Sequence, residues 1–65
     1  ILAEFNQCVF EKGFYIDLSK LGSDCIITLD KCTVNGVVLT ADNYKGNITI
    51  ELPSGRTVAD CVIFK

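Results

Sequence analysis

The side chains best suited to chemistry in this sequence are the thiols of its four cysteines, which are Cys8, Cys25, Cys32 and Cys61. Thiols act as nucleophiles, as zinc ligands or as disulfide partners. The 65-residue chain contains no histidine, so neither a Cys–His nor a Ser–His nucleophile pair can form. The cysteines also lack the CxxC spacing that is typical of zinc sites. An even number of cysteines in so short a chain predicts two disulfides instead.

The remaining polar residues do not form a catalytic pattern. The eight acidic residues fall mostly on expected turns and solvent-facing positions, and no spacing forces two carboxylates together. The five glycines occupy turn positions and do not form a phosphate-binding loop. We therefore expect a protein that is not an enzyme and that uses no cofactor and no metal.

Length and charge set the class of protein. A chain of 65 residues forms a single domain, residues 1–65, whose small core barely offsets the entropy lost on folding, so disulfides are expected to add stability. The net charge of −2 gives no attraction to nucleic acid or to anionic membranes. The absence of methionine and the start at Ile1 favour a processed, secreted protein, which we expect to be a monomer.

The apolar pattern predicts strands along nearly the whole chain. β-Branched and aromatic residues alternate with polar ones, and glycine-containing turns separate the alternating runs. No helical stripe is longer than one turn, and no internal repeat is apparent. The expected strands are residues 5–10, 14–18, 25–34, 37–42, 47–52 and 56–64.

The first two strands are expected to pair as a hairpin. Glu11-Lys12-Gly13 suits a three-residue loop with glycine in the left-handed region. Phe10 would then lie opposite Phe14, on the face that packs against the core. Tyr15 and Asp17 would point from the opposite face toward solvent or a partner.

The third strand, residues 25–34, changes phase along its length. Its apolar residues before Asp30-Lys31 have the opposite parity to those after it, so we expect a bulge there. Asn35-Gly36 then predicts a two-residue hairpin turn. If residues 25–34 are one strand, Cys25 and Cys32 are roughly 20 Å apart, which is too far for a disulfide. The bridges are then either Cys8–Cys32 with Cys25–Cys61, or Cys8–Cys25 with Cys32–Cys61.

The last third of the chain carries a turn, a glycosylation motif and a change of sheet. Pro53-Ser54-Gly55 predicts a turn between the fifth and sixth strands. Asn47-Ile48-Thr49 is an N-glycosylation sequon, with Asn47 pointing outward. The sixth strand is expected to switch sheets near Ala59-Asp60. Six short antiparallel strands predict either two small packed sheets or a partly open barrel.

The chain resembles the MAX effectors, which are small secreted virulence proteins of plant-pathogenic fungi. Three stretches carry the resemblance, and they are the cysteine-containing "CVFEKG", the alternating "IITLDKCTVNGVVLTAD" and the turn-containing "ITIELPSGRTV". The resemblance implies an all-β, disulfide-stabilised, six-stranded antiparallel sandwich, with strands 1-2-6 packed on strands 3-4-5. The usual family disulfide joins the first strand to the loop before the fifth, and here that loop, "ADNYKG", has no cysteine. The resemblance to a two-disulfide toxin of the family favours Cys8–Cys32 with Cys25–Cys61.

The resemblance also implies a function. It predicts a secreted effector, translocated into the host cell, that binds a host plant protein without catalysis. In similar proteins an exposed sheet edge extends a β-sheet of the host protein, and strand 14–18, with Tyr15 and Asp17, would supply that edge here. The alternatives are an extracellular β-sandwich binding module of the lectin or adhesin kind, and a small secreted toxin or inhibitor.

Overall fold

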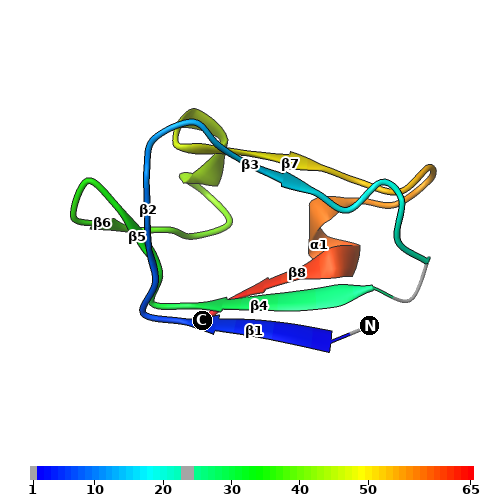
Figure 1. Ribbon diagram of the computed structural model, residues 1–65, viewed down its shortest axis with the longest axis horizontal. Coiled ribbons are helices and arrows are strands. Elements are labelled where there is room, and N and C mark those ends of the chain that lie inside the picture. The colour runs from blue at the N-terminus through cyan, green and yellow to red at the C-terminus, as the bar shows by residue number, and fades with distance from the viewer. Residues whose placement is uncertain (1, 23–24) are drawn as a thin grey trace.

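The computed structural model describes residues 2–22 and 25–65, and within them the chain forms three small sheets (Figure 1). The strand orders are β1-β4-β8, β2-β5-β6 and β3-β7. In chain order the elements are β1 (Leu2–Asn6), β2 (Val9–Phe10), β3 (Phe14–Asp17), β4 (Ile26–Asp30), β5 (Thr33–Val34), β6 (Val37–Val38), the 3₁₀ turn η1 (Tyr44–Gly46), β7 (Ile48–Glu51), the helical turn α1 (Val58–Cys61) and β8 (Val62–Phe64).

The chain winds twice around a common axis and then begins a third circuit. The first coil comprises β1, β2 and β3, and the second coil comprises β4 to β7. Figure 1 shows β1, β4 and β8 along one side of the molecule, β2 and β5 at one end, and β3 and β7 along the opposite side. Strand β4 is parallel to β1 and β8, β5 is parallel to β2, and β7 is parallel to β3. This arrangement is a short parallel β-solenoid.

Successive segments of the two coils lie in register with each other. Leu2 lies opposite Ile26 and Val9 lies opposite Thr33, so both strand pairs join residues 24 positions apart. The β3–β7 pair joins residues 34 positions apart, because the hairpin to β6 and the turn η1 are inserted between β5 and β7. The matched segments are "LAEFNQCVF" with "IITLDKCTV" and "FYIDL" with "ITIEL". This correspondence is not visible in the sequence alone, because few residues are identical and the insertion changes the spacing.

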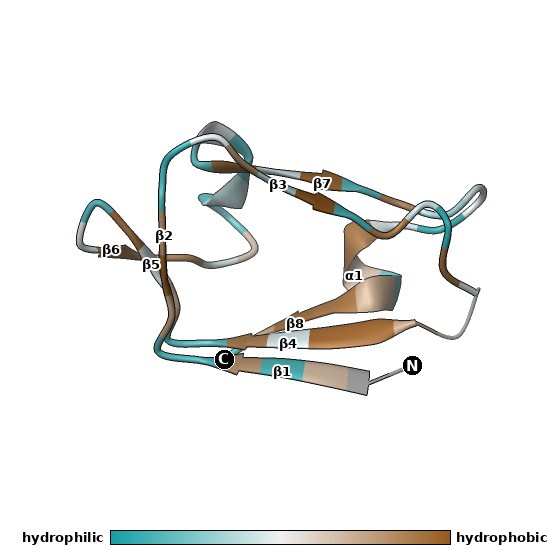
Figure 2. Ribbon diagram, viewed as in Figure 1, coloured by the Kyte–Doolittle hydropathy of each residue, from teal (hydrophilic) through white to brown (hydrophobic). Residues whose placement is uncertain are grey.

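Matched positions of successive coils stack in columns that form the core. Phe5 lies opposite Leu29, and Leu29 lies opposite Phe64 on the other side. Phe10 lies opposite Val34 in the same way. The buried residues are Leu18, Cys25, Ile27, Leu29, Cys32, Val34, Leu39, Ile48, Cys61 and Val62. Figure 2 shows this hydrophobic content along β3, β4, β7 and β8.

Two residues with left-handed backbone make the first corner of each coil. Gln7 has a φ of 54° and Lys31 has a φ of 53°, and the register places one above the other. The turn reverses the side-chain parity, so Leu29 before it and Cys32 after it both point into the core. The bulge expected near Asp30-Lys31 is therefore this corner of the coil, and the expected strand 25–34 is divided between β4 and β5.

The prediction of an all-β protein is confirmed, and the antiparallel sandwich of sheets 1-2-6 and 3-4-5 is wrong. The loop at Glu11-Lys12-Gly13 does form a turn, in which the Phe14 N–H donates to the Glu11 carbonyl at 3.0 Å. It turns a corner, however, so β2 and β3 pair with the second coil and not with each other. The hairpin at Asn35-Gly36 is confirmed, with Val34 opposite Val37.

The expected last strand, residues 56–64, is a helical turn followed by a short strand. Thr57 and Asp60 form a capping box around the start of α1, in which the Thr57 Oγ1 accepts from the Asp60 N–H at 3.3 Å and an Asp60 carboxylate oxygen accepts from the Thr57 N–H at 3.1 Å. The place where a change of sheet was expected is thus helical. The helical turn carries the chain back to β4, on which β8 pairs.

Candidate functional site

The inward side chains of the first coil are less covered than those of the second. Phe5 is 36% exposed, whereas its column neighbour Leu29 is fully buried. Phe14 is 44% exposed, whereas its neighbour Ile48 is 3% exposed. The second coil has a neighbour on both sides at β4, but the first coil has one only on the side of the second coil within the described residues. We call this uncovered end the open face. It consists of Ala3, Phe5, Cys8, Phe10, Phe14 and Ile16.

Three phenylalanines hold the open face together. The rings of Phe5 and Phe10 meet edge to face, with centroids 6.1 Å apart. The rings of Phe10 and Phe14 are stacked with centroids 4.9 Å apart and an interplanar angle of 4°. Each ring comes from a different strand, so the cluster joins all three strands of the coil. Such a rigid aromatic surface can be buried by a partner at little cost in side-chain entropy.

The open face is bordered by the outer edges of β1, β2 and β3. Within the described residues each of these strands pairs on one side only. On β3 the Leu18 N–H donates to the Glu51 carbonyl at 2.8 Å. Because successive residues of a parallel strand bond to opposite sides, the N–H groups of Tyr15 and Asp17 point away from β7. A sheet edge with free backbone groups is the site at which strand addition occurs.

Tyr15 and Asp17 lie on the outward side of β3, as the sequence predicted. The Tyr15 hydroxyl donates to Glu51 Oε1 at 3.1 Å. The pKa of Tyr15 is raised, mainly by partial burial and secondly by this hydrogen bond. Asp17 Oδ1 accepts from the Ser19 hydroxyl at 2.5 Å and from its N–H at 2.9 Å, and these bonds hold the pKa of Asp17 below its ordinary value.

A pair of like charges results on this side of the coil. Asp17 and Glu51 are directly opposite each other in the β3–β7 register. Among the described residues neither carboxylate forms an ion pair, since both accept from neutral donors. Like charges in this position oppose strand pairing, and a cation beside them would relieve the repulsion. The edge of β3 is therefore apolar on its inner side and acidic on its outer side.

The four cysteines are free thiols in this structure, so the two expected disulfides are not formed in it. The thiols nevertheless meet in pairs. Cys8 and Cys32 occupy matched corners of the two coils, and the Thr33 N–H donates to the Cys8 carbonyl at 2.9 Å. Burial, and then a hydrogen bond with the Cys61 thiol, raises the pKa of Cys25. Cys32 is also buried, and the burial raises its pKa.

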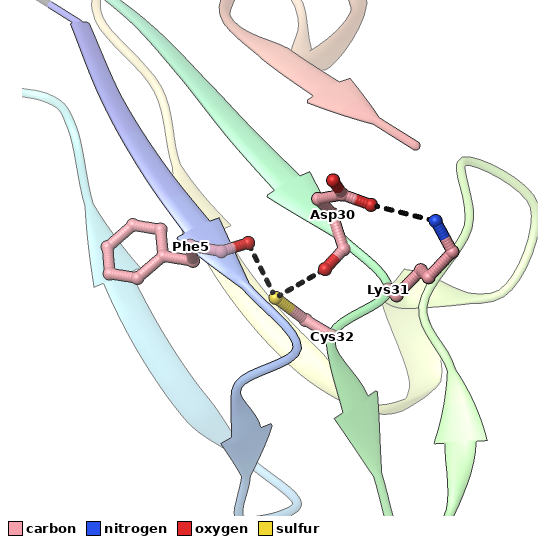
Figure 3. A network of polar contacts seen from close by, with 4 residues as sticks. All are labelled: Phe5, Asp30, Lys31 and Cys32. Atoms are coloured by element: carbon pink, nitrogen blue, oxygen red, sulfur yellow. Dashed lines mark hydrogen bonds and ion pairs between the residues drawn. The ribbon is translucent and has the colours of Figure 1, made fainter.

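The Cys32 thiol binds backbone oxygens at the corner (Figure 3). Its Sγ donates to the Phe5 carbonyl at 3.2 Å and lies 3.8 Å from the Asp30 carbonyl. On the outer side of the same corner, Lys31 Nζ forms an ion pair with Asp30 Oδ1 at 3.4 Å. Cys32 thus joins β1 to the turn after β4, and it lies within the fold and not at the surface.

Two further features lie away from the open face. The Asn47 side-chain amide, the expected glycosylation acceptor, donates to the Asn43 carbonyl at 3.0 Å and is half-buried. A shallow cleft of about 260 Å³ lies between the η1 turn and α1, where the Tyr44 and Phe64 rings stack with centroids 5.5 Å apart. Its lining residues are Ala41, Tyr44, Lys45, Val58, Ala59, Val62 and Phe64. No sequence pattern predicts this cleft, because the expected strand 56–64 would not have formed it.

Groups of three or more metal-ligating side chains do not occur in residues 2–22 and 25–65. No helix within these residues has both the length and the apolar character needed to cross a bilayer. Comparisons with protein-family models, with curated proteins and with solved structures found no match to this chain.

Proposed function

We propose that this chain is a non-catalytic protein-binding module that accepts an extended segment of a partner along β3, on the open face of its first coil. The observation that supports the proposal is the combination of a one-sided strand edge with half-exposed inward phenylalanines. Backbone hydrogen bonds would supply affinity, and alternate side chains would supply selectivity. The opposite edge of β3 already pairs with β7 of the second coil through backbone hydrogen bonds.

The chemistry of β3 defines the partner. Inward-pointing positions of the partner should be apolar, because they would cover Phe14 and Ile16. Outward-pointing positions should be basic, because they would lie beside Asp17, which already faces the like charge of Glu51. The proposed partner is therefore a polypeptide segment in which apolar residues alternate with lysine or arginine.

The effector hypothesis is a narrower form of this proposal. It names a host plant protein as the partner and a host cell as the location, and it rests on the resemblance to MAX effectors alone. The antiparallel sandwich that the resemblance implied is not the arrangement observed, so the fold adds no support to that identity. The expected binding edge, strand 14–18, is the same in both proposals.

The proposal can be tested with two fluorescein-labelled peptides. Both copy residues 47–52, the segment that pairs with β3 in the protein, and one carries Glu51→Lys. Fluorescence anisotropy at low salt should show saturable binding, and the lysine peptide should bind about two- to fivefold more tightly, as expected for a favourable cross-strand charge pair. The variant Asp17→Lys should reverse the order of the two peptides.

Two substitutions of Tyr15 distinguish the contribution of its backbone to binding from that of its side chain. Tyr15→Pro removes an N–H that points away from β7, so the fold should be kept while strand addition is blocked. Tyr15→Ala keeps the N–H and should retain most of the binding. Equal binding by the proline variant and by the unchanged protein would exclude strand addition at β3. Dimerisation in sedimentation that Tyr15→Pro abolishes would assign the edge to a second copy of the chain.

A further inference from the structure

The cysteines of successive coils lie one above another, and their arrangement is independent of the proposed function. Cys8 and Cys32 occupy the same corner, one coil apart, and neighbouring parallel strands are about 4.8 Å apart. That separation lies within the roughly 4.4–6.8 Å between Cα atoms that a disulfide spans. The register therefore brings the Cα atoms of these two residues to a separation that a disulfide can span.

The second pair joins the second coil to the start of the third. Cys25 immediately precedes β4, and Cys61 ends α1 immediately before β8, which pairs with β4. Both residues are buried, with 1% and 0% exposure, and they lie just before Ile27 and Val62, which are register partners in β4 and β8. The register of β4 and β8 therefore places these two buried cysteines at neighbouring positions.

The other pairings conflict with the strands. Cys25 precedes the five-residue strand β4, and Cys32 follows it, so the two ends are about 16 Å apart at 3.3 Å per residue. Because Cys8 lies beside Cys32, it is similarly distant from Cys25. The alternatives Cys25–Cys32 and Cys8–Cys25 are therefore excluded by reach.

We propose that this chain is oxidised to a form with two bridges between coils, Cys8–Cys32 and Cys25–Cys61. The oxidant is a small-molecule disulfide such as oxidised glutathione. For each bridge, one cysteine thiolate attacks the small disulfide and releases one small thiol, and the second cysteine then displaces the other small thiol. Two protein thiols and one small disulfide thus become one protein disulfide and two small thiols.

The bridges connect the coils in the direction in which they stack. The first bridge closes the first coil onto the second at a corner, and the second bridge fixes the short third circuit, which consists of β8 alone. Cys25, Cys32 and Cys61 are buried, and Cys8 is half-buried at the open face, so both bridges would reinforce the pairing between coils from its inner side. The oxidised form should therefore unfold at a higher urea concentration than the reduced form.

A tryptic digest without reduction gives a direct test. The six basic residues divide the chain so that each cysteine falls in a different tryptic peptide. These peptides are residues 1–12, 21–31, 32–45 and 57–65. The purified chain is reduced, unfolded in urea, and refolded in a mixture of reduced and oxidised glutathione. The free thiols are alkylated before digestion.

Mass spectrometry should find peptide 1–12 linked to 32–45 and peptide 21–31 linked to 57–65. Any other pairing as the main product, or alkylation of all four thiols, would overturn the proposal. The double variants Cys8→Ser/Cys32→Ser and Cys25→Ser/Cys61→Ser should each retain the remaining bridge. Loss of both bridges in a double variant that is still β-structured by circular dichroism would show that the two pairs are not independent units.

Discussion

Leu29→Ala tests the stacking of coils more directly than any other single change. Leu29 is fully buried in the central strand β4, with Phe5 on one side and Phe64 on the other. Phe5→Ala is the matched control, because it removes a larger side chain from the same column at the end of the stack. If the first coil is uncovered, the smaller residue in the middle should matter more than the larger residue at the end.

The expected costs follow from burial. Truncating a fully buried leucine costs about 2–5 kcal/mol, and Leu29 should lie near 3–4 kcal/mol because strands on both sides prevent the cavity from closing. A fully buried phenylalanine would cost about 3–5 kcal/mol. Phe5 is 36% exposed, and its site is open to water, so about 1–2 kcal/mol is expected. A domain of 65 residues has a total stability of roughly 3–10 kcal/mol.

Urea unfolding of the reduced proteins, followed by circular dichroism, measures both costs. Leu29→Ala should lower the free energy of unfolding by about 30% of its total value or more, and should shift the urea midpoint down in proportion. Phe5→Ala should give a clear folded baseline. The reasoning fails if Phe5→Ala costs as much as Leu29→Ala or more, because the first coil would then be covered as fully as the second.

Three more predictions follow from local features. Lys31→Gly and Gln7→Gly should each raise the free energy of unfolding by up to about 1 kcal/mol, because glycine adopts the left-handed backbone of these corners without strain. A loss of stability in urea unfolding at either position would contradict the assigned conformation. Thr57→Ala should cost about 1 kcal/mol in the same assay by removing the helix cap, and an unchanged urea midpoint would show that the capping box contributes nothing. In the reduced protein, burial is the main reason that the folded-state pKa values of Cys25 and Cys32 lie above the ordinary value of 9.0. The neutral thiols therefore stabilise the fold below pH 9, and this stability is lost as the pH rises through the folded-state pKa values. The urea midpoint of the reduced protein should therefore be lower at pH 10 than at pH 7. If the midpoint falls by the same amount in the protein with both pairs bridged, the thiols are not the cause and the assignment is refuted.

Local features of the fold could be predicted from the sequence, but strand partners could not. The Asn35-Gly36 hairpin and the turns at residues 11–13 and 53–55 were predicted because their backbone needs specific residue types. The change of phase at Asp30-Lys31 was also visible. Alternation shows which side of a strand faces the core, but it does not show which strand lies beside it. A tight turn therefore suggested hairpins where the chain in fact turns a corner and pairs one coil later.

The candidate site was predictable to the same extent. The outward direction of Tyr15 and Asp17 follows from alternation, whereas the position of strand 14–18 at a sheet edge was expected from the resemblance. Within the described residues β3 has both properties. The open face did not follow from the sequence, since its exposure arises from the position of the first coil in the stack. The helical turn at Thr57 and Asp60 could have been recognised, because the two residues have the spacing of a capping box.

The parallel pairing also fixes the order in which the chain can fold during synthesis. Among the described strand pairs, only β5 and β6 are close in sequence, and every other pair joins residues 24 to 35 positions apart. Closing a loop of 24 residues costs ~3 kcal/mol of chain entropy before the strands gain any contact. At a synthesis rate of roughly 5–20 residues per second, the first coil waits about 1–5 s for its partner strands. The phenylalanines of the first coil are thus exposed to other proteins during translation, before the second coil exists to pair with it.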